Sequence, residues 1–149
     1  MERVKINLPE TLLHKLRLRV RITDINYGNH TGNDRIVAMI HDVRAEWLRT
    51  NGYTELDING TGLIMADLAM QFTGESFFGD ELEVQLYVDK NSISKVAFNL
   101  YYLVTKVTSD GTFEIAKAKT GLVSFNYQIR KPAPFPPALT QMLNLLPPR

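Results

Sequence analysis

A polar stretch between a strand-like segment and a helix-like segment holds most of the residue types in this chain that could do chemistry. The stretch RITDINYGNHTGND spans residues 21–34. Its polar and ionisable side chains are Asp24, Asn26, Asn29, His30, Asn33 and Asp34, with Gly28 and Gly32 among them. Histidine can give or take a proton near neutral pH, whereas an amide can only donate and accept hydrogen bonds. Asn26 can therefore orient a water or a substrate oxygen, while His30 and Asp24 can transfer protons.

The stretch also leads into a predicted helix, which adds backbone donors to the site. Residues 34–50 carry apolar side chains at helical spacing, Asn33 is the predicted N-cap, and Gly52 is placed to end the helix. The first N–H groups of a helix have no partner within it and lie at the positive end of its dipole. Gly28 and Gly32 allow the backbone to approach a ligand closely. The helix start therefore predicts an oxyanion hole.

Each of these residues also has a purely structural interpretation. Asp24 and Asn26 are typical turn residues that bind backbone groups. Asn33 is better explained as a helix cap than as a catalytic group. An isolated His30 would usually be a hydrogen-bonded structural histidine. On spacing alone, both interpretations stay open.

Strands with one buried face are predicted over most of the remaining chain. KLRLRVRIT, residues 15–23, alternates strictly, and the preceding residues 8–16 predict a short helix,. Four further strands are predicted over residues 62–72, 81–89, 95–107 and 112–129,. Asp110 and Gly111 are typical of a hairpin turn between the last two strands. An amphipathic tail, residues 138–146, follows a proline-rich segment.

This order of elements predicts an α+β fold in which a twisted antiparallel sheet wraps around one long helix. We expect the apolar face of that helix, with Trp47, to be buried against the sheet. No repeat or linker interrupts residues 1–149, so a single domain is expected,.

Composition excludes several classes of protein. The net charge is +1, and without a basic tract no nucleic-acid partner is expected,. The absence of cysteine excludes disulfides, thiolate metal sites and cysteine nucleophiles,. No apolar run approaches the roughly 20 residues of a membrane helix, and the first residues lack a signal-peptide core. We expect a cytoplasmic protein with no membrane partner, metal or cofactor.

The pattern D-x-N-x-x-x-H at residues 24–30, followed by a helix with RAEWL near its end, resembles the hotdog-fold thioesterases. The nearest group is that of 4-hydroxybenzoyl-CoA thioesterase and related bacterial acyl-CoA thioesterases. FFGDELEV (77–84) and the closing PFPPALTQML (134–143) are similar to further segments of that family. The resemblance covers nearly the whole chain.

The resemblance implies hydrolysis of an acyl-CoA thioester, with a homodimer or homotetramer that places the site between subunits. The family usually has an aspartate, acting as base or nucleophile, at the position of Asn26, and a glycine at the position of Asn29. The resemblance implies Asp24, Asn26 and His30 as catalytic residues and Gly28, Gly32 and Asn33 as the substrate-binding residues. A carboxylate from a facing strand, Asp67 or Glu75, is a weaker candidate. The cations that could meet coenzyme A phosphates, or that form ordinary surface charge, are Lys90, Lys95, Lys106, Arg130 and Lys131.

Two other functions stay open. A hotdog protein that binds an acyl thioester or another apolar ligand without turnover is compatible with Asn26. A hydratase or dehydratase ranks last, because that pattern has a proline after the asparagine and its histidine one residue closer, and DINYGNH has neither.

Overall fold

The computed structural model describes residues 1–144, which form an antiparallel sheet with helices packed against it. The sheet has the strand order β1-β3-β4-β5-β2, so β1 and β2 are its edges. The strands are β1 (Thr11–Arg19), β2 (Gly62–Phe72), β3 (Glu81–Asp89), β4 (Ala97–Thr108), β5 (Gly111–Asn126) and the two-residue β6 (Lys131–Pro132), which pairs with β5. The helices are α1 (Asn33–Thr50) and α2 (Pro137–Asn144), with short 3-10 turns η1 (Ile22–Asp24) and η2 (Lys90–Ser92).

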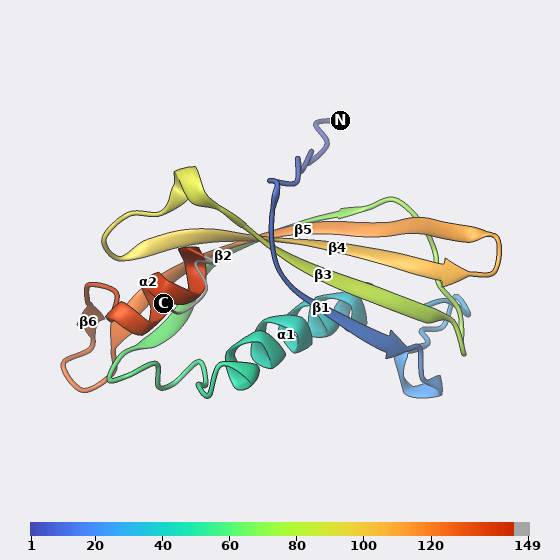
Figure 1. Ribbon diagram of the computed structural model, residues 1–149. Helices are drawn as coiled ribbons and strands as arrows, with labels where there is room; N and C mark the ends of the chain where they lie inside the picture. Colours follow the sequence, from blue (N-terminus) through green and yellow to red (C-terminus); the bar gives the residue numbers. More distant parts are fainter. Residues whose placement is uncertain (145–149) are drawn as a thin grey trace.

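The sheet is strongly twisted and α1 runs along one of its faces (Figure 1). An antiparallel sheet curled over a helix is the α+β arrangement of a hotdog fold, as the order of elements predicted. The hairpin at the end of β4 closes with Thr108 opposite Gly111, which has φ +130°. No helix within residues 1–144 combines the length and apolar character needed to cross a membrane.

The core lies between α1 and the sheet, and it confirms the predicted apolar faces. Trp47 is only 3% exposed. The predicted inward residues of β3 are all buried, namely Leu82, Val84, Leu86 and Val88. The buried residues of α1 include Ile36, Met39, Ile40 and Val43. Gly52 has φ +86° just after the helix, as its predicted role as the terminating glycine requires,.

Two local predictions are wrong. Residues 8–16 do not form a helix, because β1 begins at Thr11 and pairs with β3 from Thr11–Val88 to Arg19–Glu81. Pairing with a distant strand overrides a weak local helix preference. The N-cap of α1 is Gly32, and Asn33 is the first helical residue, with its Oδ1 accepting from the Asp34 amide at 2.7 Å.

A buried arginine on α1 is the main feature of the core that the sequence pattern did not predict. Arg44 is 5% exposed, and its Nε donates to Glu55 Oε1 at 2.9 Å while Nη1 donates to the Tyr102 hydroxyl at 3.0 Å. The Tyr102 hydroxyl in turn lies 2.7 Å from Thr120 Oγ1. Burial alone would lower the pKa of Arg44, but Tyr102 and Glu55 raise it above its usual value. The guanidinium is therefore charged and held by two partners on the core side of α1.

Candidate functional site

The polar stretch before α1 forms a compact turn held by its own backbone. The Asn26 amide donates to the His30 carbonyl at 2.9 Å, and the Asn29 amide donates to the Asn26 carbonyl at 3.1 Å. Asn26 Oδ1 accepts from the Gly28 amide at 2.9 Å. Asn29 has φ +66°, the left-handed conformation that asparagine tolerates best after glycine,. Asn29 therefore adopts a backbone conformation that suits the glycine usually found there in the family.

His30 is oriented by a neighbouring carbonyl. Its Nδ1 lies 3.1 Å from the Thr31 carbonyl oxygen. Because a carbonyl only accepts, Nδ1 must carry the hydrogen, and Nε2 is left free to exchange a proton. A Cβ at Gly28 would lie 3.2 Å from His30 Nε2 and 3.3 Å from Asn26 Oδ1. A side chain at position 28 would therefore press on both the imidazole and the amide.

A buried hydrogen-bonded clamp ties this turn to the segment after β2. The Thr31 amide donates to the Ser76 carbonyl at 2.8 Å, and the Thr31 hydroxyl donates to the same carbonyl at 3.1 Å. The Ser76 hydroxyl donates to Thr31 Oγ1 at 2.7 Å. Both residues are buried. Positions 30 and 75, next to the clamp, are therefore fixed relative to each other.

A cavity of about 400 Å³ opens beside this clamp. His30, Asn33 and Glu75 are among its polar lining residues, and Ile36, Phe72 and Ile115 form apolar wall. The start of α1 thus borders a space with one imidazole, one carboxylate and an apolar surface. Within residues 1–144, no group of three or more histidine and carboxylate side chains is arranged to hold a metal ion.

Among the residues that the structure describes, the first amides of α1 are all hydrogen-bonded except that of Asn33, a residue that lines this cavity. The Gly32 amide donates to the Asp24 carbonyl at 3.0 Å, and the Asp34 amide donates to the Asn33 side chain. The Arg35 and Ile36 amides both donate to the Gly32 carbonyl. The Asn33 amide makes no hydrogen bond to any part of the chain that the structure describes. The N–H of Asn33 is therefore the remaining candidate among these amides for the donor of the predicted oxyanion hole.

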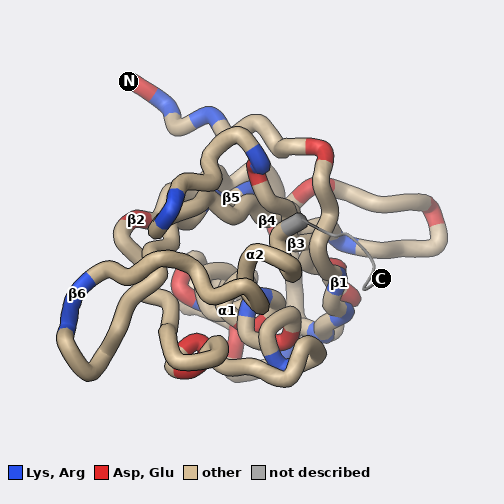
Figure 2. The backbone as a smooth tube through the Cα atoms, turned by 60° about the vertical axis from the view of Figure 1, so that its left-hand side comes forward, with Lys and Arg blue, Asp and Glu red and all other residues tan. Residues whose placement is uncertain are grey.

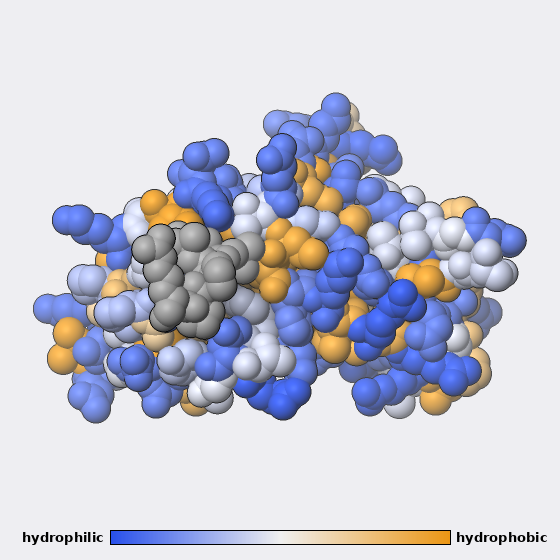
Figure 3. Space-filling model, in the orientation of Figure 1, coloured by the Kyte–Doolittle hydropathy of each residue, from blue (hydrophilic) through white to orange (hydrophobic). Residues whose placement is uncertain are grey.

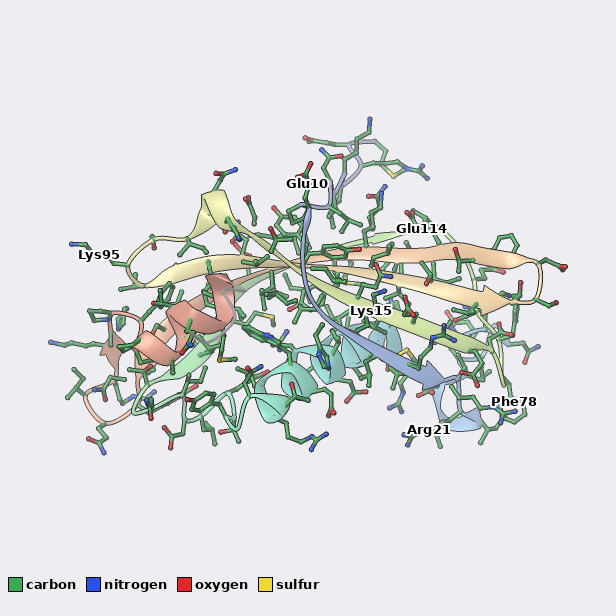
Figure 4. All side chains as sticks on the ribbon, viewed as in Figure 1. Glu10, Lys15, Arg21, Phe78, Lys95 and Glu114 are labelled. Carbon is green, nitrogen blue, oxygen red and sulfur yellow. The ribbon has the colours of Figure 1, made fainter. Side chains whose placement is uncertain are left out.

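Asp24 lies on the other side of the turn. Its Oδ2 accepts from the Arg21 amide at 2.8 Å, and the residue lines a separate, larger groove of about 910 Å³ between β1 and α1. That groove is also lined by Arg17, Arg19, Arg21 and Arg35. Arg21 and Phe78 mark its position beyond the end of β1 (Figure 4). The structure thus brings His30 and Asn33 to one cavity, places Asn26, Gly28 and Gly32 next to them, and turns the Asp24 carboxylate away.

The arginine groove is electrically mixed rather than uniformly positive. Arg17 pairs with Glu83 at 3.1 Å, and Asp24 and Asp42 also line the groove. Basic and acidic segments alternate along the β1 side of the molecule (Figure 2). These arginines fit the predicted solvent face of an exposed strand.

The position of Glu75 beside His30 and the clamp between Thr31 and Ser76 carry no local signal in the sequence. Glu75 is separated from His30 by a helix and a strand, and no spacing rule relates the two positions. Thr31 and Ser76 carry no local signal either, because serine and threonine in loops are ordinary. Only the pairing of distant segments reveals these contacts.

The family of the chain follows from a comparison with known proteins. The model of the thioesterase-like superfamily matches residues 20–143, and the chain belongs to that superfamily. No curated protein matches the chain by sequence.

Solved structures share the fold at low sequence identity. A 1,4-dihydroxy-2-naphthoyl-CoA thioesterase from Synechocystis is 20% identical, with a TM-score of 0.79 over 89% of this chain and 96% of its own. The protein SAV2348 from Staphylococcus aureus, solved in complex with CoA, is 16% identical, with a TM-score of 0.76 over 94% of this chain and 86% of its own. The gentisyl-coenzyme A thioesterase BH1999 is 16% identical, with a TM-score of 0.72 over 87% of this chain and 98% of its own.

Proposed function

We propose that this protein hydrolyses an acyl-CoA thioester to a free acid and coenzyme A, at the cavity beside the start of α1. The observation that carries the proposal is the convergence of His30 and Asn33 on one partly apolar cavity, with the Asn33 amide free of any partner among residues 1–144. Membership of the thioesterase-like superfamily supports thioester chemistry. Two of the solved relatives are named as thioesterases of aromatic acyl-CoA substrates, which guides the choice of test compounds.

In this mechanism the thioester carbonyl oxygen lies against the Asn33 amide. A water oxygen attacks the carbonyl carbon, and the negative charge that develops on the carbonyl oxygen is stabilised by that N–H. When the C–S bond breaks, His30 Nε2 in its protonated form gives its proton to the departing sulfur. Asn26 orients the attacking water or the carbonyl. We assign Asp24 a positioning role, because its carboxylate holds the Arg21 amide and its carbonyl holds the Gly32 amide.

We further propose that the protein acts as a homodimer, or as a tetramer built from dimers. β2 is an edge strand, and the large apolar side chains Met65, Leu68 and Phe72 on it are exposed. The face that carries β1 is mostly hydrophilic, with small separate apolar areas (Figure 3). A second copy paired along β2 would complete the hotdog arrangement, with α1 at its centre. Because Phe72 also lines the cavity, the partner would border the site. Light scattering tests this assembly, and a monomer at micromolar concentration would contradict it.

We propose that the substrate is an acyl-CoA of the cytoplasm. A panel of aliphatic and aromatic acyl-CoA compounds tests the proposed activity. Release of the thiol is followed with a thiol-detecting reagent. We expect hydrolysis of at least one compound by the wild type and a loss of about 10²–10⁴-fold in kcat for His30→Ala. Binding without hydrolysis across the whole panel would favour the second candidate, an acyl-thioester-binding protein. Its supporting observation is that Asn26 Oδ1 is engaged by the Gly28 amide and cannot act as a base,.

A further inference from the structure

The proposed reaction needs a group that takes the proton of the attacking water, and position 26 supplies only an amide. We propose that Glu75 is this general base. The inference rests on the proposed function and assigns the base for that reaction. It stands on where the chain holds Glu75, on the engagement of other nearby carboxylates, and on the chemistry that the cavity requires.

Glu75 is held in place by its two neighbours in the chain. On one side, the Gly74 amide donates to the Ile115 carbonyl at 3.0 Å, and a Cβ at Gly74 would lie 2.4 Å from the Glu114 carbonyl oxygen. Only glycine fits such a close approach to β5. On the other side, Ser76 is locked to Thr31 by the buried clamp. Glu75 is thus presented to the same cavity as His30 and Asn33 by a segment fastened at both ends.

Other carboxylates near the site are already engaged. Asp24 binds the Arg21 amide in the separate groove. Asp67 accepts from Lys119 at 2.7 Å and from the Gly121 amide at 2.9 Å. The Lys119 hydrogen bond lowers the pKa of Asp67, which makes it a poorer base. Glu114 pairs with Lys117 at 3.4 Å. Glu75 forms no salt bridge with any residue among positions 1–144, so its carboxylate is available to a water in the cavity.

With Glu75 as the general base, every proton transferred in the reaction has a donor and an acceptor. The Glu75 carboxylate takes one proton from water while the water oxygen forms a bond to the thioester carbon. The C–S bond breaks, and the sulfur takes a proton from His30. Glu75 then returns its proton to His30, directly or through solvent, which restores both side chains. The net change is one water consumed, one carboxylic acid and one thiol formed.

The test compares Glu75→Gln with Glu114→Gln on a substrate that the wild type hydrolyses. Glu114→Gln removes a nearby carboxylate that does not line the cavity, so it is the matched control and should leave kcat unchanged. We expect Glu75→Gln to lower kcat by about 10²–10⁴-fold, with little change in KM, because a base acts in the chemical step. Glu75→Asp, which keeps a carboxylate, should retain part of the activity.

A second measurement separates a chemical role from a structural one. Added formate should raise the activity of Glu75→Ala, and chloride at the same ionic strength should not, because only formate supplies a carboxylate. Circular dichroism melting checks that each variant is folded. Wild-type hydrolysis combined with full activity of Glu75→Gln, or with no effect of formate, overturns the assignment of Glu75 and leaves the proposed function standing. If the wild type hydrolyses nothing, the proposed function falls and this inference falls with it.

Discussion

The two sides of the turn before α1 carry similar residue types, but they differ in whether the polar groups already have hydrogen-bond partners. On one side, Asp24 shares a groove with several arginines, and its carboxylate already accepts a backbone amide. On the other side, His30, Asn33 and Glu75 border a smaller cavity with apolar walls. A polar group that is already bound stabilises the fold, whereas one that is oriented but unbound can act on a ligand. The difference places the proposed chemistry on the His30 side, and the following variants test that assignment.

The largest contrast should lie between His30→Ala and Asp24→Asn. We expect His30→Ala to lower kcat by about 10²–10⁴-fold, as removal of a proton-transfer group does. Asparagine at position 24 can still accept from the Arg21 amide, so Asp24→Asn should cost about 1 kcal/mol of stability at most. Steady-state kinetics and thermal melting measure both effects. Equal losses of kcat in the two variants would show that the Asp24 carboxylate acts in catalysis. That result would contradict the proposed difference between the two sides of the turn.

The next effect concerns the single amide at the start of α1. Asn33→Pro removes the N–H, and proline is well tolerated at the first helical position. Gly32, with φ −67° and ψ 148°, already has the extended backbone that a residue before proline prefers,. We expect Asn33→Pro to lower kcat by about 10²–10³-fold. Asn33→Ala loses the same side chain but keeps the N–H, so the ratio of the two variants isolates the amide. A ratio near one would show that the oxyanion is held elsewhere.

The two glycines of the turn should respond differently to alanine. A Cβ at position 28 would press on both His30 Nε2 and Asn26 Oδ1, so a shift of a few tenths of an ångström is required. Since a displacement of about 1 Å can cost roughly 10²-fold in rate, we expect about a tenfold loss of kcat for Gly28→Ala. A Cβ at Gly32 would meet the Asp34 carboxylate at 2.5 Å, but that side chain is mostly exposed and can rotate away. A larger kinetic effect for Gly32→Ala than for Gly28→Ala would contradict this geometry.

The smallest effect should come from the arginine groove. Arg19→Gln and Arg21→Gln change exposed side chains, and such substitutions usually alter stability by less than about 0.5 kcal/mol. Because neither residue lines the cavity that holds His30, we expect kcat/KM on acyl-CoA to change by about twofold or less,. A salt-dependent rise in KM for these variants would instead connect the groove to the phosphates of the substrate.

The sequence pattern predicted features that depend on local chemistry. Gly52 ends α1, Trp47 is buried, and the strands after the helix lie close to their predicted limits. The short helix at residues 8–16 was wrong because the pairing of β1 with β3 decides that segment. The clamp between Thr31 and Ser76 joins positions 45 residues apart, so no local rule could find it. Glu75 and His30 are equally far apart in the sequence, and only the cavity that both residues line relates them.

The buried position of Arg44 constrains how this chain can vary. Loss of Glu55 would leave the buried guanidinium without its carboxylate, at a cost of up to about 3–5 kcal/mol,. Loss of Tyr102 would leave a donor without its acceptor, at a cost of about 1–3 kcal/mol,. Replacement of all three side chains by apolar ones of similar volume can be tolerated, whereas each single step toward that core is penalised. Positions 44, 55 and 102 should therefore covary among close relatives of this protein, changing together or remaining together.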